Sequence, residues 1–140
     1  MGLENGRDRI GGELAVEDGP EVGDDGMESY LGIRPGTDAE GGLQGGHWAH
    51  GNFGYFPTYS LGSVVAAQLY DAAERDIEGL EGRIRAAEFD RLHEWLTDNV
   101  HRHGKRYETN ELVRRATGED VTADAFVDYA TAKYGELYGL

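Results

Sequence analysis

The chain has 140 residues, a length typical of one domain, and carries 27 acidic against 13 basic side chains, a formal net charge of −14. That charge argues against binding to nucleic acid or to an anionic membrane, since both require a positively charged surface. Only Lys105 and Lys133 are lysines, and an acid-rich, lysine-poor composition is typical of proteins adapted to high salt.

Glycine is concentrated in the first part of the chain, which holds sixteen of the 22 glycines before residue 63. Because a glycine inside a helix or strand costs about 1 kcal/mol relative to alanine, we expect residues 1–26 to be a flexible, acidic segment. A short helical turn is expected within it at Glu13–Glu17, and a short helix at Met27–Leu31. The helical segment of the domain is therefore placed at residues 27–140.

Four amphipathic helices are expected in the remainder of the chain. Ser60 is the expected cap of the first, which runs through LGSVVAAQLYDAAERDI, and the second spans about Gly82–Arg102. Thr109 and Thr122 are the expected caps of the last two. No segment alternates as a strand does, so the predicted fold is all-α, with a partly irregular, glycine-rich N-terminal third. The apolar stripes are thin, and we expect the chain not to bury a complete core alone.

Metal-binding motifs are incomplete in this sequence. Cysteine is absent, which excludes disulfides, cysteine–zinc sites and a thiol nucleophile. The one His-Glu pair, in HEWLT at His93–Thr97, lacks the second histidine of a His-Glu-x-x-His zinc helix because position 97 is threonine. His93 and Glu94 are therefore expected to be ordinary residues of a helix surface, and no metal site is predicted.

The segment Gly42–Tyr59, GLQGGHWAHGNFGYFPTY, combines glycine with histidine and aromatic residues. A metal bound by His47 and His50 requires a further ligand that no nearby spacing supplies. His47 and the tyrosines are better suited to donate hydrogen bonds to an oxyanion or a carboxylate. The alternative is an aromatic loop packed on the next helix, with Phe53 and Phe56 as its core anchors, and spacing alone leaves both interpretations open.

Signatures of other classes are missing. No Gly-Lys-Ser/Thr phosphate loop and no Gly-x-Ser-x-Gly elbow occurs. The first residues lack the apolar core of a signal peptide, and no window approaches the roughly 18 apolar residues of a membrane span. A soluble, cytoplasmic protein is expected.

Several long segments, in order, resemble the zinc carboxypeptidases of the thermostable, Taq type. They are GELAVEDGPEVGDDGMESYLGIRPGTDAEG, DAEGGLQGGHWAHGNFGYFPTYSLGSVVAAQLY and WLTDNVHRHGKRYETNELVRRATGED, and the resemblance covers roughly Asp8 to Leu140. It implies that the chain is the C-terminal part of a larger, almost wholly helical enzyme that releases amino acids from peptide C-termini. That family holds zinc with a His-Glu-x-x-His helix and a downstream glutamate, all upstream of this segment, so this chain is expected to bind no zinc itself.

The resemblance also implies roles for particular residues. Gln44, His47 and Trp48 fall on a Gly-x-x-Gln-Asp-x-His-Trp signature, and Tyr55 and Tyr59 on a Gly-Tyr-Phe-Pro-Thr-Tyr segment. His47 with Tyr55 or Tyr59 is then expected to supply the catalytic donors to the substrate carbonyl or carboxylate. Gln44 and Trp48 are expected to contact the substrate.

Departures from the family pattern bear on activity. The signature aspartate is Gly45 here, and bulky family positions read Gly19, Gly23 and Gly26. Each buried side chain lost in this way removes about 2–5 kcal/mol of packing. Because it lacks the His-Glu-x-x-His zinc helix of the family, the chain alone is expected to be inactive. The alternative is a non-catalytic assembly module that complements a separate zinc-bearing chain, or that forms a homodimer through exposed apolar helix faces.

Overall fold

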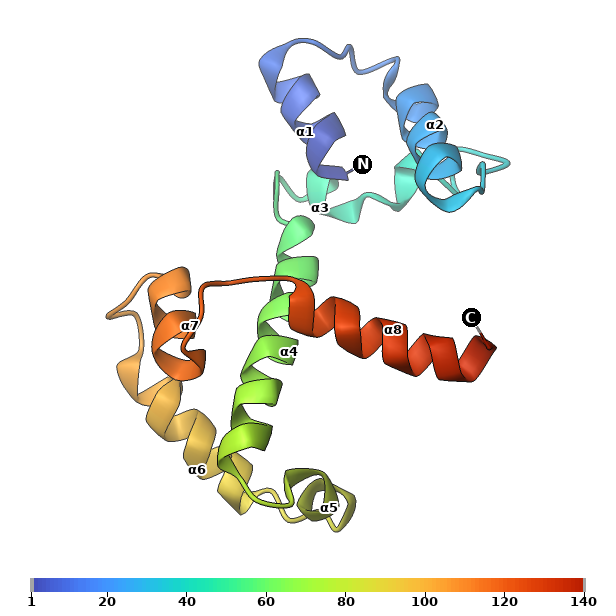
Figure 1. The fold of residues 1–140 in the computed structure, drawn as a ribbon. Helices are drawn as coiled ribbons and strands as arrows, with labels where there is room; N and C mark the ends of the chain where they lie inside the picture. The colour runs from blue at the N-terminus through green and yellow to red at the C-terminus, as the bar shows by residue number, and fades with distance from the viewer. Residues whose placement is uncertain (1, 140) are drawn as a thin grey trace. The chain divides into compact units, whose positions relative to one another are not determined.

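The computed structural model describes residues 2–139, and within them it contains helices and turns but no strand (Figure 1). The prediction of an all-α fold is confirmed. The chain divides into two compact units, Met1–Ser60 and Leu61–Leu140, called unit 1 and unit 2 below. Among the described helices, none is long and apolar enough to cross a membrane.

Unit 1 contains two longer helices and two single turns. They are α1 (Gly2–Gly11), α2 (Gly19–Leu31), the 3-10 turn η1 (Gly42–Gln44) and the short α-helix α3 (Gly46–Ala49). The helical turn expected at Glu13–Glu17 is wrong, because these residues form the bends and turns that join α1 to α2. The helix expected at Met27–Leu31 exists, but it begins earlier, at Gly19.

Glycine is tolerated in these helices because it permits close packing. Gly6 of α1 is buried, and a Cβ atom added to it would lie 3.4 Å from Cζ2 of Trp48. Gly12 then ends α1 with a left-handed backbone, φ 78°, in which the amide of Glu13 donates to the carbonyl of Asp8 over 2.8 Å. Glycine content alone therefore understated the helical structure of this segment.

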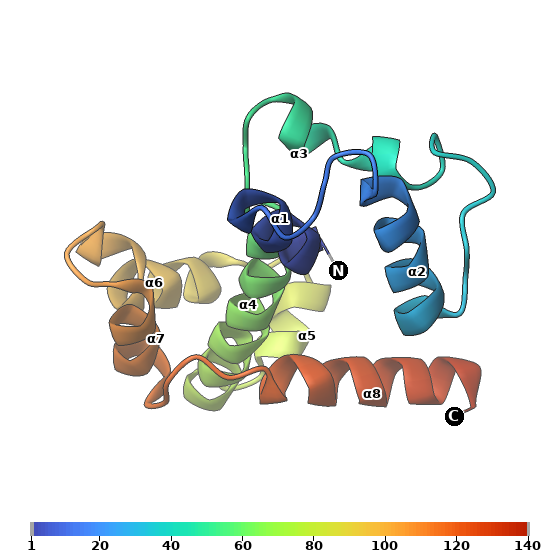
Figure 2. The ribbon, with the colours of Figure 1, turned by 90° about the horizontal axis from the view of Figure 1, so that it is seen from above.

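Unit 2 is built around α4, whose first turn crosses the boundary between the units. Its helices are α4 (Pro57–Asp76), α5 (Leu80–Arg85), α6 (Asp90–Asn99), the 3-10 turn η2 (His101–His103), α7 (Thr109–Thr117) and α8 (Asp124–Tyr138). Figures 1 and 2 both show α6 and α7 side by side, and α8 running away from α4.

Three of the expected helix caps are wrong. Thr109 is the first residue of α7, whose N-cap residue is Glu108. Ser60 lies inside the first turn of α4, which begins at Pro57, since a proline at the first helical position has a suitable φ and lacks only an N–H that would be unpaired there. Thr122 is one residue before the formal cap of α8, although its hydroxyl accepts the amide of Asp124 over 3.3 Å.

The single helix expected at Gly82–Arg102 is wrong: α5, α6 and η2 occupy this range. The break is at Ala87, the one non-glycine residue with positive φ (58°) in the described structure. Its amide donates to Ile84 over 2.9 Å and the next amide, of Glu88, donates to Arg83 over 2.8 Å. This is the hydrogen-bond pattern usually made by a glycine just after the C-terminus of a helix. Here that position is alanine, so the sequence gives no sign that the helix ends.

Replacing Ala87 by glycine is therefore expected to stabilise unit 2. Relief of the left-handed strain contributes about 1–2 kcal/mol, and the greater freedom of glycine in the unfolded chain offsets about 0.4–1 kcal/mol of it. A gain of about 0.5–1 kcal/mol in the free energy of unfolding is expected in urea titrations followed by circular dichroism. Ala86→Gly, one residue earlier and at negative φ, is the control and is expected to destabilise.

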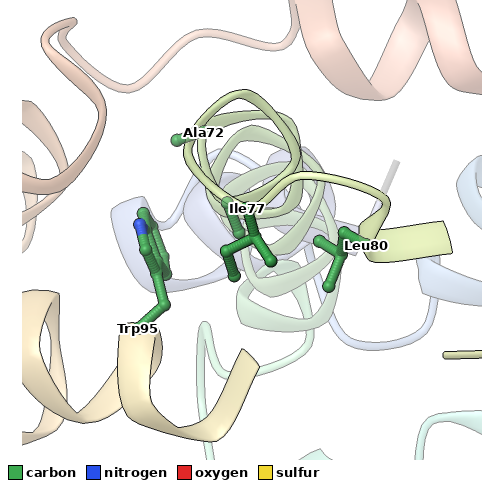
Figure 3. Packing of buried hydrophobic residues seen from close by; sticks show 5 residues of the cluster. Ala72, Ile77, Leu80 and Trp95 are labelled. Atoms are coloured by element: carbon green, nitrogen blue, oxygen red, sulfur yellow. The ribbon is translucent and has the colours of Figure 1, made fainter. Parts of the chain in front are cut away.

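The buried core of unit 2 lies where α4, α5 and α6 meet (Figure 3). Leu80 is 1% exposed and Trp95 8%, and they pack with Ala72, Ala73 and Ile77. The indole N–H of Trp95 donates to the carboxylate of the exposed Asp76 over 2.7 Å, so the one polar atom of this ring has a partner at the edge of the core.

A buried glutamine joins α4 to the connection between α7 and α8. Gln68 is 4% exposed. Its amide nitrogen donates to the carbonyl of Asp120 over 2.9 Å, and its amide oxygen accepts the N–H of Thr122 over 3.3 Å. One side chain therefore pairs two backbone groups immediately before α8, and fixes where that helix begins.

Unit 1 differs from unit 2 in its burial. Among its residues whose burial is described, only Gly6 and Gly19 are buried, and no large apolar side chain is. The buried hydrophobic residues described for the chain all lie between Ala72 and Val113. Within the described structure, the hydrophobic core thus belongs to unit 2.

Candidate active-site wall

The segment Gly42–Tyr59 turns back on itself after α3. Gly51 has φ 74°, and the amide of Asn52 donates to the carbonyl of His47 over 2.8 Å, which is again a glycine-terminated helix end. Pro57 then starts α4. This reversal brings the aromatic residues that follow α3 to the side chain of His47.

His47 lies among three aromatic rings. Its ring centroid is 5.5 Å from that of Tyr55, 5.5 Å from that of Phe56 and 5.7 Å from that of Tyr59. The hydroxyl oxygen of Tyr59 is 3.5 Å from His47 Nε2. His47 is half-buried, whereas both tyrosines are exposed. The three predicted donors therefore share one location, with polar atoms that a ligand can reach.

Trp48 points to a second group of side chains in unit 1. Its ring meets Phe53 edge-on, with centroids 4.6 Å apart, and the guanidinium carbon of Arg9 lies 5.7 Å from its centroid. A Cβ atom added to Gly19 would lie 1.2 Å from Arg9 Nη2. The guanidinium thus occupies the space beside Gly19, and a larger residue there excludes it. The sequence held no signal that linked Arg9 to Trp48.

Gln44 and Gly45 form the turn that leads into α3. The amide nitrogen of Gln44 donates to the carbonyl of Ala39 over 2.5 Å, so this side chain braces its own loop. Gly45 is the N-cap residue of α3 and provides no side-chain cap. A Cβ atom there would lie 3.4 Å from the carbonyl oxygen of Gly42, which leaves room for an aspartate to cap α3.

An open cavity of about 730 Å³ lies within unit 1 and includes three of the five predicted site residues, Gln44, His47 and Trp48, in its lining. Tyr55 and Tyr59 are not among its lining residues. The structure thus places His47 between the cavity and the two tyrosines.

The alternative interpretation of this loop, in which Phe53 and Phe56 anchor it in the core, is wrong. Phe53 is 56% exposed and Phe56 is 63% exposed. Their rings contact Trp48 and His47, so they pack within the segment and leave their other faces open.

The described residues do not fit a zinc site. They include no group of three or more histidine, cysteine, aspartate or glutamate side chains placed to hold a metal ion. His50 Nδ1 lies 2.8 Å from the carbonyl of Gly46 and must donate to it. The prediction that His93 and Glu94 are surface residues of a helix is confirmed, since both are exposed on α6.

Comparisons with known proteins agree on one family. The sequence pattern of the family described as "Carboxypeptidase Taq (M32) metallopeptidase" matches residues 2–134. Thermostable carboxypeptidase 1 of Pyrococcus furiosus is 46% identical over 122 residues, or 87% of this chain and 24% of that protein. Carboxypeptidase 1 of Bacillus subtilis is 44% identical over 126 residues, or 90% of this chain and 25% of that protein.

A solved structure extends the similarity to the fold. The M32 carboxypeptidase of Deinococcus radiodurans R1 superposes with a TM-score of 0.92 at 43% identity, over 99% of this chain and 28% of that one. The chain therefore spans about a quarter of the length of the relatives it matches.

Proposed function

Because the chain belongs to the M32 metallocarboxypeptidases, we propose that it forms one wall of the site at which such an enzyme releases amino acids from peptide C-termini. The observation that supports this most directly is the convergence of Tyr55 and Tyr59 on His47, with ring centroids 5.5 and 5.7 Å away. These are the residue types that donate hydrogen bonds to a carbonyl or a carboxylate.

The proposed roles follow from where negative charge develops during hydrolysis. As a nucleophile adds to the scissile carbonyl, the oxygen becomes an oxyanion, and fixed donors stabilise it more than they stabilise the substrate. His47 and Tyr59, with the hydroxyl and Nε2 3.5 Å apart, provide two such donors or a grip on the terminal carboxylate. Tyr55 supports them, and Gln44 and Trp48 contact the substrate from the cavity.

Zinc ligands have to come from another part of the enzyme in this proposal. The described residues offer no cluster for a metal, and the sequence contains no His-Glu-x-x-His. When bound in such an enzyme, zinc polarises the carbonyl and activates water. The isolated chain is accordingly proposed to have no peptidase activity of its own.

A chimera tests the proposed roles. This chain replaces the matching quarter of Bacillus subtilis carboxypeptidase 1, and release of C-terminal residues is measured by amino-acid analysis. His47→Ala is expected to lower kcat/KM by about 10²- to 10³-fold, the usual effect of losing one oxyanion donor. His93→Ala, at an exposed site on α6, is the matched control and is expected to leave kcat/KM unchanged.

Gly45→Asp in the same chimera is expected to raise activity, since the aspartate caps α3 directly before His47.

A zinc-loaded, folded chimera in which His47→Ala keeps full activity contradicts the proposed role of His47. Stoichiometric zinc in the isolated chain, together with release of C-terminal residues, contradicts its proposed inactivity.

A second candidate function is that of a complementing subunit for a separately encoded zinc-bearing chain. It is favoured by the exposure of large aromatic side chains in unit 1, where Phe53, Tyr55, Phe56 and Tyr59 are all at least half exposed. Mixing with the other three quarters of the Bacillus subtilis enzyme, followed by light scattering and activity assays, separates the possibilities. Activity only on mixing supports the subunit, and a two-chain mass without the partner indicates a homodimer.

A further inference from the structure

The indole ring of Trp48 lies on helix α1, although the two are far apart in the sequence. Trp48 is 37% exposed and lines the cavity of unit 1. A Cβ atom added to Gly6 would lie 3.4 Å from its Cζ2 atom, and the guanidinium carbon of Arg9 lies 5.7 Å from the ring centroid. Residues three apart on a helix share a face, so Gly6 and Arg9 present one surface of α1 to this ring.

The guanidinium of Arg9 has no partner of opposite charge among the described residues. Arg9 is half-buried, and within that part of the chain its side chain makes no hydrogen bond or ion pair. Arg7, on the same helix, is exposed and pairs with Asp8 at 3.0 Å. Partial burial of an unpaired cation is unfavourable, and the face of Trp48 is the favourable contact that the structure gives it. An ion pair therefore does not explain why this position is arginine.

Gly19 provides the space in which this guanidinium lies. A Cβ atom added to Gly19 would lie 1.2 Å from Arg9 Nη2 and 2.3 Å from Arg9 Cζ, so any larger residue at this position displaces the guanidinium. Gly19 is buried at the start of α2, and it is not among the glycines with positive φ. Space beside Arg9, and not backbone conformation, is therefore what favours glycine here. The volume that a bulky residue would occupy is filled by Arg9.

We propose that Arg9 and Gly19 form a pair that positions the ring of Trp48 in the cavity wall. Arg9 holds the ring by its cationic contact, and Gly19 leaves the volume that Arg9 requires. Arg9 acts through Trp48 and is therefore a positioning residue. The inference deepens the proposed function, on which only its kinetic consequence rests, because the position of the ring is measured without zinc or substrate.

Nuclear magnetic resonance of the full labelled chain tests the position of the ring, and the two tryptophans of the chain give an internal reference. In the unaltered chain, nuclear Overhauser contacts are expected from the Trp48 ring to Gly6 Hα and to Arg9 Hδ. Arg9→Gln keeps a planar polar group without the charge, and is expected to lose the contact with Gly6 and to make the Trp48 indole N–H more mobile in ¹⁵N relaxation. The Trp95 indole, which donates to Asp76 in unit 2, is expected to be unchanged.

Three further variants separate the pair from a general effect on α1. Arg9→Lys keeps a cation and is expected to retain the contact of the ring with Gly6. Gly19→Leu displaces the guanidinium and is expected to cause the same loss as Arg9→Gln. Arg7→Gln is the matched control, since it removes an exposed arginine from the same helix, and is expected to leave the ring in place.

The proposal is overturned if the Trp48 ring keeps its contact and its mobility in either Arg9→Gln or Gly19→Leu. It is also overturned if the unaltered chain shows no contact between that ring and Arg9, a measurement that holds even where the variants do not fold.

The kinetic consequence is measured in the chimera with Bacillus subtilis carboxypeptidase 1. Trp48→Ala and Arg9→Gln are each expected to raise KM about three- to tenfold with kcat changed by less than about twofold, the pattern of a lost binding contact. Combined, they are expected to raise KM no more than Trp48→Ala does, since Arg9 acts through that ring. Additive effects, or a rise for Trp48→Ala without one for Arg9→Gln, overturn the positioning role. An unchanged KM for Trp48→Ala contradicts instead the proposed contact of Trp48 with substrate, and the ring measurements on the chain alone still decide the pair.

Discussion

Replacing Trp95 by alanine is expected to lower the free energy of unfolding of unit 2 by about 3–5 kcal/mol, the usual cost of removing a buried tryptophan. The ring is 8% exposed and packs on a cluster that is otherwise two alanines, an isoleucine and a leucine. Partly buried apolar side chains, such as Leu92 and Leu96, also pack against this cluster, and replacing the indole by a methyl group removes its contacts with them. The loss also leaves the carboxylate of Asp76 without the N–H that it accepts at 2.7 Å. Urea titration followed by circular dichroism measures the change.

Two further variants separate packing from the hydrogen bond. Trp95→Phe keeps an aromatic ring but removes the N–H, and is expected to cost less than Trp95→Ala by at least 1 kcal/mol. Val127→Ala, at a site on α8 that is 53% exposed, is the control and is expected to change stability by less than about 0.5 kcal/mol. Similar losses for Trp95→Ala and Val127→Ala mean that this cluster is not the core of the unit.

Replacing Gln68 by leucine is expected to cost about 1–3 kcal/mol, the contribution of two hydrogen bonds, although the two side chains are similar in size. Leucine leaves both the carbonyl of Asp120 and the N–H of Thr122 without the partner that Gln68 provides at 2.9 and 3.3 Å. Each such hydrogen bond contributes about 0.5–1.5 kcal/mol, since Asp120 is exposed and Thr122 half-buried. The same urea titration gives the total, and amide hydrogen exchange is expected to accelerate at Thr122.

The exchange measurement distinguishes a local effect from a general one. Faster exchange confined to the connection before α8 is expected at mild denaturant, since the helices of the core do not depend on that pair of hydrogen bonds. A Gln68→Leu variant as stable as the unaltered chain, with unchanged exchange at Thr122, shows that water replaces the glutamine and that the connection is not held by it.

The end of a helix was predictable from this sequence where a glycine stands just after it. Gly118 ends α7 and Gly32 ends α2 in left-handed conformations, as glycine after an apolar stripe suggests. The break at Ala87 was not predictable, because alanine favours helix, whereas here it takes the positive φ that closes the helix end. Helix α1 and the first part of α2 were missed because glycine was taken to disfavour helix, whereas at Gly6 of α1 a glycine allows close approach to Trp48.

The candidate site was predictable in its composition but not in its surroundings. His47, Tyr55 and Tyr59 lie within one segment, so a local reversal of the chain is enough to bring them together. Arg9 and Asp24 come from α1 and α2, and their positions beside Trp48 and Gly41 depend on contacts between segments distant in sequence. Periodicity and motif spacing report on one element at a time and carry no information about such pairs.

The core of unit 2 has a consequence for the order in which the chain folds. Its members, from Ala72 to Trp95, are near neighbours along the chain, so few residues have to be closed into a loop before the cluster is buried and the entropy of closure is small. Proteins dominated by such local contacts fold fast. We therefore expect the helices α4 to α6 to form early in folding, before contacts between residues far apart in the sequence.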